Sequence, residues 1–278
     1  LVGQRHTDRM TLLEAGYDWS KSTRDNYQAA KDDPTYGQYT APFAQLREGI
    51  DHAYHGVYTL TRQAVQDELM QEVLDGGGDA QQRPWIVFTA GAMGAGKSRS
   101  MAYLSERGIF PLSQVVQVDP DLFKAALPEW GEYCQRDPLS AGFHTRQESG
   151  LCCELVQEAA MRRGQHIWVD GSLRDGAWYK RVFESIRQRH PRYRIAIFHV
   201  VVQPAAVFTR ALRRAEETGR HVPESEIRDS LERVPRAVEL LTPHAQHCAE
   251  LVAQAHLRAP KVTASHRAPW VDGLIELT

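Results

Sequence analysis

The chain has 278 residues, the size of one large domain or of one domain with an additional segment. Its hydrophobic content of 42% and charged content of 24% are close to those of globular proteins, which excludes a disordered chain. The formal net charge is -2, from 33 basic and 35 acidic residues. The chain therefore lacks the overall basic excess that favours nucleic acid as a partner.

Cysteine usage and hydropathy limit the compartment. The four cysteines, at positions 134, 152, 153 and 248, form no Cys-x-x-Cys pair, and this pattern is typical of a reducing compartment. Apolar runs are strand-sized and fall short of the roughly 18–20 residues that a membrane-spanning helix needs. We therefore expect a cytoplasmic protein without a disulfide framework and without a membrane partner.

The first 80 residues differ in pattern from the rest. Residues 1–40 are polar with scattered aromatic residues, which predicts an extended arm or short helices. From Phe43 to Leu74 apolar residues recur at three- to five-residue steps, which indicates helix. Three consecutive glycines within Asp75–Asp79 predict a flexible break. We therefore expect a helical N-terminal extension over residues 1–80 and a catalytic domain over residues 81–278.

After this break, β-rich runs alternate with helical patterns. Strands are predicted at Trp85–Ala90, Val115–Val118, Ile167–Asp170 and Arg194–Val202. Helices are predicted at Lys97–Arg107, Arg146–Arg163, Trp178–Arg189 and Pro204–Glu217. A last element within residues 248–257 fits a strand or a helix. Because continuous apolar strands are typical of a sheet covered on both faces, we expect a three-layer α/β fold with a mostly parallel sheet.

The segment from Gly91 to Ser98 matches the pattern G-x-x-x-x-G-K-S/T in full, between a predicted strand and a predicted helix. Glycines allow backbone N–H groups to surround phosphate oxygens, and the helix N-terminus adds its positive end. Lys97 is expected to reach the β- and γ-phosphates, and Ser98 to bind Mg²⁺. The predicted nucleotide-binding residues are Gly91, Ala92, Met93, Gly94, Ala95, Gly96, Lys97, Ser98 and Arg99.

Two aspartates follow the second predicted strand. Ligands of a doubly wound sheet bind outside the carboxyl ends of its strands, so Asp119 and Asp121 are expected near the γ-phosphate. A kinase needs a carboxylate that orients the acceptor hydroxyl and takes its proton. We predict Asp121 as this base, and Asp119 beside the substrate, where it supports Mg²⁺ or the helix N-terminus. The alternative for either aspartate is to cap the helix that begins at Leu122.

From about Trp85 to Leu241 the chain resembles the zeta-toxin family of P-loop small-molecule kinases. The resemblance rests on five pieces in the family's order. They are the end of the phosphate loop, Asp119-Pro-Asp121-Leu-Phe123, a helix that carries Glu148, Asp170-Gly171-Ser172-Leu173-Arg174, and an arginine-bearing lid followed by Val-Pro-Glu.

This resemblance implies a P-loop kinase fold, ATP or GTP with Mg²⁺ as cofactors, and Asp121 as the base. It also implies that Glu148, Ser172 and Arg174 contact the acceptor, with Arg174 catalytic beside Lys97. Ser172 stands where the family has threonine and keeps the hydroxyl group. The lid arginines that would bind ATP phosphates are Arg213, Arg214 and Arg220.

Each of these residues also has an ordinary interpretation. An acid such as Glu148 in the first turn of a helix is favoured by the helix dipole. Arg174 fits an exposed arginine at a helix start, and the lid arginines fit a solvated face. Arg213 and Arg214 are adjacent and point to different sides, so only one of them is expected to reach ATP.

Together these residues predict an ATP-dependent phosphotransferase that acts on a hydroxyl group of a small molecule. By resemblance, the acceptor is a nucleotide sugar such as UDP-N-acetylglucosamine, or a nucleotide or dinucleotide such as NAD. A polynucleotide kinase is the second enzyme hypothesis and requires a basic groove. A non-catalytic nucleotide-binding switch is the third and requires no acceptor pocket. The resemblance also leaves room for an inhibitory protein partner.

Overall fold

The computed structural model describes residues 16–218, 222–252 and 261–263. The chain divides into two compact units, here named by their content. The helical unit comprises Leu1–Leu74 and Asp119–Ala159, and the sheet unit comprises Asp75–Val118 and Ala160–Thr278. The predicted domain boundary at residue 80 stays a prediction, because compactness alone does not define a domain that folds by itself.

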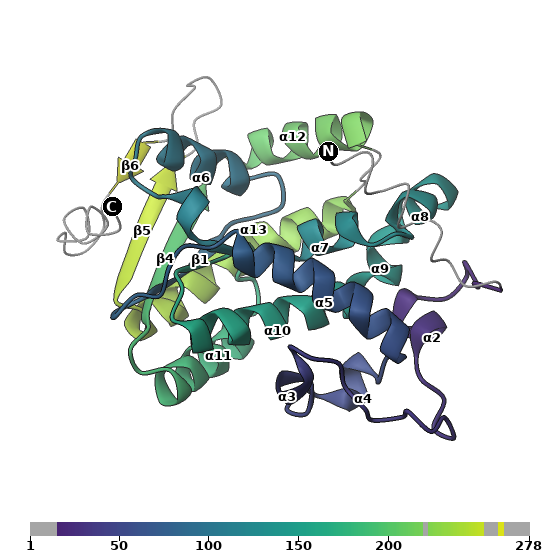
Figure 1. The fold of residues 1–278 in the computed structure, drawn as a ribbon. Helices are drawn as coiled ribbons and strands as arrows, with labels where there is room; N and C mark the ends of the chain where they lie inside the picture. The colour runs from purple at the N-terminus through teal and green to yellow at the C-terminus, as the bar shows by residue number, and fades with distance from the viewer. Residues whose placement is uncertain (1–15, 219–221, 253–260, 264–278) are drawn as a thin grey trace. The chain divides into compact units, whose positions relative to one another are not determined.

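The sheet unit contains a six-stranded sheet in the order β2-β3-β1-β4-β5-β6 (Figure 1). The first five strands pair in parallel, and β6 pairs antiparallel with β5 at the edge. The strands are β1 (Trp85–Ala90), β2 (Val116–Val118), β3 (Ile167–Val169), β4 (Arg194–Val201), β5 (His247–Val252) and β6 (Lys261–Thr263). The predicted mostly parallel α/β sheet is confirmed. The ambiguous last element is strand β5, and residues 253–257 of that prediction lie outside the described residues.

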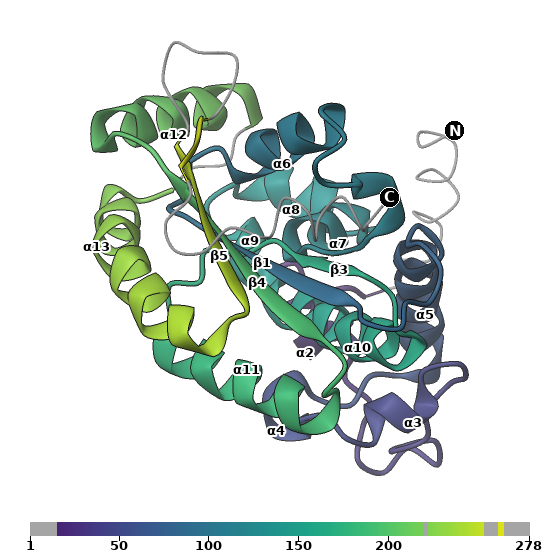
Figure 2. The ribbon, with the colours of Figure 1, turned by 90° about the vertical axis from the view of Figure 1, so that its left-hand side faces the viewer.

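Helices cover both faces of this sheet. Figure 2 shows α6 (Lys97–Glu106) on one side of the strands, and α11 (Gly176–Arg189) and α13 (Glu224–Leu241) on the other. Side chains alternate along a strand, so Val87 of β1 packs in the cluster that contains Met101 of α6, while Phe88 contacts Phe183 of α11 at 4.8 Å between ring centroids. Burial on both faces explains why β1 is almost entirely apolar, with Thr89 as its one polar residue. Helix α12 (Pro204–Thr218) follows β4.

The helical unit is built from short helices and two long ones. They are α2 (Thr23–Tyr27), α3 (Ala44–Arg47), α4 (His52–His55), α5 (Leu60–Asp75), α7 (Pro120–Ala126), α8 (Trp130–Arg136), α9 (Ala141–His144) and α10 (Arg146–Arg163), the last of which ends in the sheet unit. Two short 3-10 helices, Leu112–Gln114 and Thr242–His244, belong to the sheet unit.

The helical pattern predicted from Phe43 to Leu74 is divided into three helices. Asp51 caps α4 by accepting the backbone N–H groups of Ala53 and Tyr54. Gly56 ends α4 with a φ of 82°, a left-handed value that favours glycine. Only α5 continues as a long helix. Among the described helices, none has both the length and the apolar character needed to cross a membrane.

Candidate active site

The phosphate loop joins β1 to α6 and packs tightly against its neighbours in the sheet unit. Gly94 and Gly96 have φ values of 85° and 92°, which side chains rarely adopt. A Cβ atom on Gly94 would lie 2.9 Å from the backbone oxygen of Val207 in α12. Gly96 is the N-cap of α6 and makes no side-chain cap bond. The glycines thus let the loop pass close to α12, and α6 begins directly after the loop, so its positive N-terminal end adjoins the loop and favours an anion there.

Lys97 and Ser98 begin α6 and lie at the carboxyl ends of β1 and β3. The Lys97 ammonium group donates to the Gly91 carbonyl at 3.3 Å. The Ser98 hydroxyl donates to Oδ2 of Asp170 at 3.3 Å. The other carboxylate oxygen, Oδ1, accepts from the Thr89 hydroxyl at 2.9 Å. Because β1 and β3 are neighbours in the sheet, Thr89 holds Asp170 beside the serine predicted to bind magnesium.

From the sequence, Asp170 was identified as part of a motif, but no role was predicted for it. The available signal was an acid directly after a buried strand, and its significance depends on the pairing of β3 with β1. A serine hydroxyl and a carboxylate are oxygen ligands of the kind that Mg²⁺ takes together with nucleotide phosphates. The described residues contain no group of three or more His, Cys, Asp or Glu side chains that could hold a metal by themselves. A magnesium ion at this place would therefore depend on phosphate oxygens.

The segment after Asp170 returns to the phosphate loop. The Ser172 carbonyl accepts the backbone N–H of Gly91 at 3.2 Å, so the two predicted motifs meet in the sheet unit. Leu173 is fully buried and has a φ of 57°, a left-handed conformation that costs a non-glycine residue about 1–2 kcal/mol. Such conformations persist where surrounding packing enforces them and are common at functional sites.

Arg174 follows this turn and reaches α13. Its Nη1 atom lies 2.8 Å from Oε2 of Glu226 and 3.3 Å from Oδ2 of Asp229. All three side chains are partly exposed, so these ion pairs are worth at most about 1 kcal/mol each. An anionic ligand can therefore compete for the Arg174 guanidinium. Its role towards the acceptor stays a prediction.

Positive charge gathers where α12 meets the phosphate loop. Arg210 donates from Nη1 to the Ala95 carbonyl at 3.0 Å. Burial, and then the cations Arg99 and Arg213, lower the pKa of Arg210. This arginine is in the cluster identified from the sequence but was not predicted to bind nucleotide. The side chain of Arg214 and the whole of Arg220 lie outside what the structure describes.

In the helical unit, Asp119 and Asp121 differ in role. Asp119 is the N-cap of α7 and accepts the backbone N–H of Asp121 at 2.8 Å. This is the helix-capping role that the sequence offered as the alternative for Asp119. The Asp121 side chain is 40% exposed and has Lys124 Nζ at 3.4 Å. Asp121 thus presents a solvent-accessible carboxylate, and its role as a base stays a prediction.

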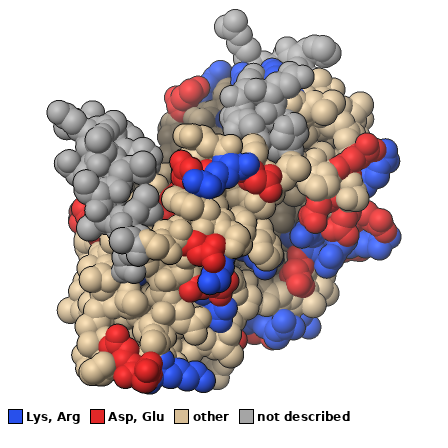
Figure 3. Space-filling model, turned by 90° about the vertical axis from the view of Figure 1, so that its right-hand side faces the viewer, with Lys and Arg blue, Asp and Glu red and all other residues tan. Residues whose placement is uncertain are grey.

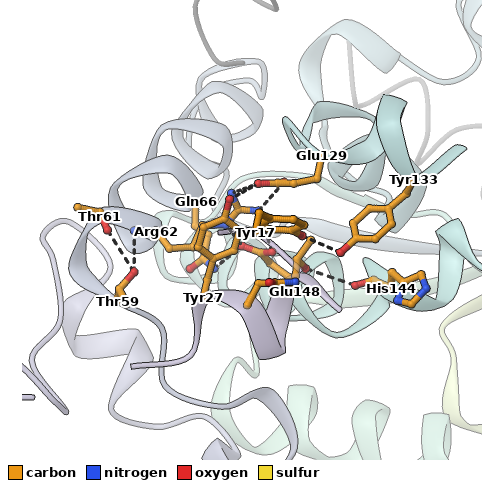
Figure 4. Close-up of polar contacts among 12 residues, drawn as sticks. Tyr17, Tyr27, Thr59, Thr61, Arg62, Gln66, Glu129, Tyr133, His144 and Glu148 are labelled. Atoms are coloured by element: carbon orange, nitrogen blue, oxygen red, sulfur yellow. Dashed lines mark hydrogen bonds and ion pairs between the residues drawn. The ribbon is translucent and has the colours of Figure 1, made fainter. Parts of the chain in front are cut away.

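Glu148 lies in the first turn of α10 and is fully buried. Its carboxylate accepts bonds from Arg62 and Gln66 of α5 (Figure 4). Burial alone would raise the pKa of Glu148, but the Arg62 cation and these bonds hold it below its usual range. The contact of Glu148 with substrate stays a prediction.

Comparisons with known proteins give the family and the fold. The zeta toxin family model matches residues 71–256. Among solved structures, the chain is similar to one from the PezAT chromosomal toxin-antitoxin system of the human pathogen Streptococcus pneumoniae. The TM-score is 0.61 and the identity 18%, over 79% of this chain and 88% of that one.

The chain is also similar to a chain of the AvrRxo1-ORF1:AvrRxo1-ORF2 complex with sulphate ions, with a TM-score of 0.61 and 12% identity over 92% of this chain and 82% of that one. For the same pair with ATP the TM-score is 0.57 and the identity 12%, over 84% and 73% of the two chains. Comparison with curated proteins gives no match. The structural likenesses show the fold, which is that of a P-loop kinase, and the family match spans more than half of the sequence. The chain belongs to the zeta toxin family.

Proposed function

We propose that the chain is an ATP-dependent phosphotransferase that moves the γ-phosphoryl group of ATP to a hydroxyl group of a small molecule. The hydrogen bond between Ser98 and Asp170, at the start of a helix that also carries Lys97, is the observation that carries this proposal. It places the loop proposed to bind phosphate beside two oxygen groups that would bind magnesium. The ATP in a structurally similar complex supports ATP as the nucleotide.

The sheet unit would bind the phosphoryl donor. Backbone N–H groups of the phosphate loop and the Lys97 ammonium would bind the β- and γ-phosphates. Ser98 and Asp170 would hold Mg²⁺, which neutralises charge on the phosphate oxygens. Arg210 and Arg213 would supply further positive charge as negative charge builds up on the leaving ADP.

Asp121 would act as the base. Asp121 would accept the proton of the acceptor hydroxyl as that oxygen forms its bond to the γ-phosphorus. The bond from the γ-phosphorus to the bridging oxygen breaks, and ADP leaves with its electron pair. The products are ADP, a phosphate ester and the proton held by Asp121.

The acceptor in this proposal is UDP-N-acetylglucosamine or a dinucleotide such as NAD. Both contain a diphosphate group, which a guanidinium such as that of Arg174 binds through two parallel hydrogen bonds. Ser172 would donate its hydroxyl to a sugar or phosphate oxygen. The toxin-antitoxin system and the two-protein complex of the similar structures support a protein partner for this chain as well.

A polynucleotide kinase has less support. On the face of the molecule in Figure 3, acidic and basic side chains of the described residues are interspersed and form no continuous basic stripe. A nucleotide-binding switch without turnover would need no accessible carboxylate at Asp121.

The test is incubation of the chain with labelled ATP and a panel of metabolites, followed by mass spectrometry. Asp121→Asn is expected to abolish transfer and to leave ATP binding unchanged. Asp33→Asn serves as the matched control, because Asp33 is an exposed aspartate of the same unit whose side chain accepts hydrogen bonds from Thr35. Full transfer by Asp121→Asn would refute the base assignment. ATP binding by the wild type without any phosphorylated metabolite would favour the switch.

A further inference from the structure

The helical unit encloses a buried ion-pair cluster, here called the Arg62 cluster, which consists of Arg62, Glu129, Glu148, Tyr27 and Gln66 (Figure 4). The Arg62 guanidinium binds both carboxylates in bidentate fashion. Its Nη1 and Nη2 atoms lie 2.9 Å from the two oxygens of Glu129. Its Nε and Nη2 atoms lie 2.6 and 2.9 Å from the two oxygens of Glu148. One side chain from α5 therefore holds two acids from other parts of the chain.

Two further side chains complete the cluster. The Gln66 amide donates to Oε1 of Glu148 at 2.7 Å. The Tyr27 hydroxyl donates to Glu129, and its ring lies 4.0 Å from the Arg62 guanidinium carbon. Exposure is 3% for Arg62 and 0% for both glutamates. The cluster is thus closed to solvent, and the Glu148 carboxylate already accepts three hydrogen bonds.

Stability alone does not account for such a cluster. Two carboxylates and one guanidinium carry a formal charge of about -1 in a low-dielectric interior, where ion pairs bring little net stability compared with packed apolar residues. What the charged groups do specify is geometry, since bidentate bonds fix both the direction and the distance between their partners.

The two glutamates of the cluster lie at the two ends of one segment, residues 129–148. Glu129 is the N-cap residue of α8, and Glu148 lies in the first turn of α10. Between them lie α8 and α9, the part of the chain that follows Asp121. Tyr133 of α8 is held in addition by the hydroxyl of Tyr17 at 2.7 Å and by the backbone oxygen of Lys21 at 2.6 Å. Residues of the segment 17–66, here called the N-terminal segment, therefore contact the segment 129–148 at Glu129, Tyr133 and Glu148.

The residues of the Arg62 cluster differ in whether they lie within the region that the family model matches. Glu129 and Glu148 lie within the residues that the family model matches, which begin at residue 71. Arg62, Gln66 and Tyr27 precede that match. The surroundings of a family-matched glutamate are therefore completed by residues from outside the matched region.

We propose that Arg62 is a positioning residue for the acceptor side of the reaction, and that Glu148 acts by binding Arg62 rather than by binding the acceptor directly. This inference rests on the proposed phosphotransferase function. Its physical basis is that residues 129–148, which follow the proposed base Asp121, are held at the starts of α8 and α10 by one guanidinium. The N-terminal segment would then determine which acceptor the chain takes.

A double-mutant cycle distinguishes the two roles of Glu148. The full chain is compared with Arg62→Lys, Glu148→Gln and the double variant, with ATP as donor and UDP-N-acetylglucosamine or NAD as acceptor. Each single variant is expected to raise the KM for the acceptor by roughly 10-fold or more, and the double variant by about the same factor as one of them, because coupled groups are not additive. The KM for ATP is expected to change by less than about twofold, since no group of the phosphate loop is altered.

The substitutions in the cycle are chosen to preserve the fold, and a control variant accompanies them. Arg62→Met leaves two carboxylates buried without a cation and is expected to unfold the helical unit, whereas Arg62→Lys and Glu148→Gln keep or reduce the buried charge imbalance. Lys31→Met is the matched control, because it removes an exposed cation of the same helical unit. It is expected to leave both KM values unchanged.

Several results would overturn the inference. Independent, multiplying effects of the Arg62 and Glu148 substitutions on the acceptor KM would show that Glu148 binds the acceptor directly. An acceptor KM unchanged by Arg62→Lys would exclude a positioning role. If the wild type phosphorylates neither acceptor nor any metabolite of a cell extract, the proposed function itself fails and this inference fails with it. Transfer by the wild type together with an unaffected cycle would refute the inference alone.

Discussion

The close approach of the phosphate loop to α12 predicts an effect of alanine at Gly94 that differs from its effect at Gly108. Both glycines have positive φ, 85° and 67°. Their surroundings differ, because a Cβ atom on Gly94 would lie 2.9 Å from the Val207 backbone oxygen, whereas one on Gly108 would have nothing within 4 Å. Gly108→Ala therefore isolates the conformational penalty, and Gly94→Ala adds the contact with α12.

The expected magnitudes follow from these two terms. A left-handed conformation costs alanine about 1–2 kcal/mol at either position. Excess packing costs about 1–3 kcal/mol more at Gly94, because a backbone oxygen cannot rotate away as a flexible side chain can. The free energy of unfolding should thus fall by about 1–2 kcal/mol for Gly108→Ala and by about 2–5 kcal/mol for Gly94→Ala.

The same contact predicts a functional difference. If the loop moves to avoid α12, its N–H groups lose their alignment, so Gly94→Ala should weaken ATP binding while Gly108→Ala should not. Urea unfolding measures the stability and isothermal titration with ATP measures the affinity. Equal losses of stability at the two glycines, or wild-type ATP affinity in Gly94→Ala, would refute the packing argument.

Three other substitutions in the sheet unit have definite expectations. Asp170→Asn should weaken ATP binding in the presence of Mg²⁺ by roughly 10-fold or more and leave Mg²⁺-free binding nearly unchanged, as titrations with and without EDTA will show. Arg210→Met should raise the KM for ATP more than that for the acceptor, and equal rises in steady-state kinetics would contradict its place beside the phosphate loop. Burial, and then Arg194, lower the pKa of His166 from 6.5 to about 4, so neutral His166 stabilises the fold fully above pH 6.5 and loses this contribution as the pH falls towards 4. The stability advantage of the wild type over His166→Asn in urea unfolding should therefore shrink between pH 7 and pH 4.5, and a constant difference would contradict the assignment.

What the sequence predicted well depends on local signals. The limits of β1 and α10 coincide with the predicted Trp85–Ala90 and Arg146–Arg163, because a continuous apolar strand and a long helical pattern are each read from neighbouring residues. The phosphate loop is equally local, and its structure is a strand, a glycine-rich turn and a helix in the predicted order.

What the sequence did not predict depends on pairing between distant residues. The role of Asp170 becomes visible only when β3 lies beside β1 and brings the carboxylate to Ser98, 72 positions earlier in the chain. The burial of Glu148 depends on Arg62, which is 86 positions away. Both acids follow ordinary local patterns, and nothing near either one indicates its partner.

The residues proposed to bind ATP and the residues proposed to bind the acceptor differ in how far local sequence patterns describe them. The residues proposed to bind ATP follow one another closely around the phosphate loop or meet it through the sheet, so a family motif describes them well. Residues 129–148, proposed to belong to the acceptor side, contact side chains that precede the family match, among them Arg62. Two family members can therefore share every motif from Gly91 to Arg174 and still differ in the segment that shapes residues 129–148. Under this reasoning, the nucleotide follows from the family, while the acceptor follows from the individual chain.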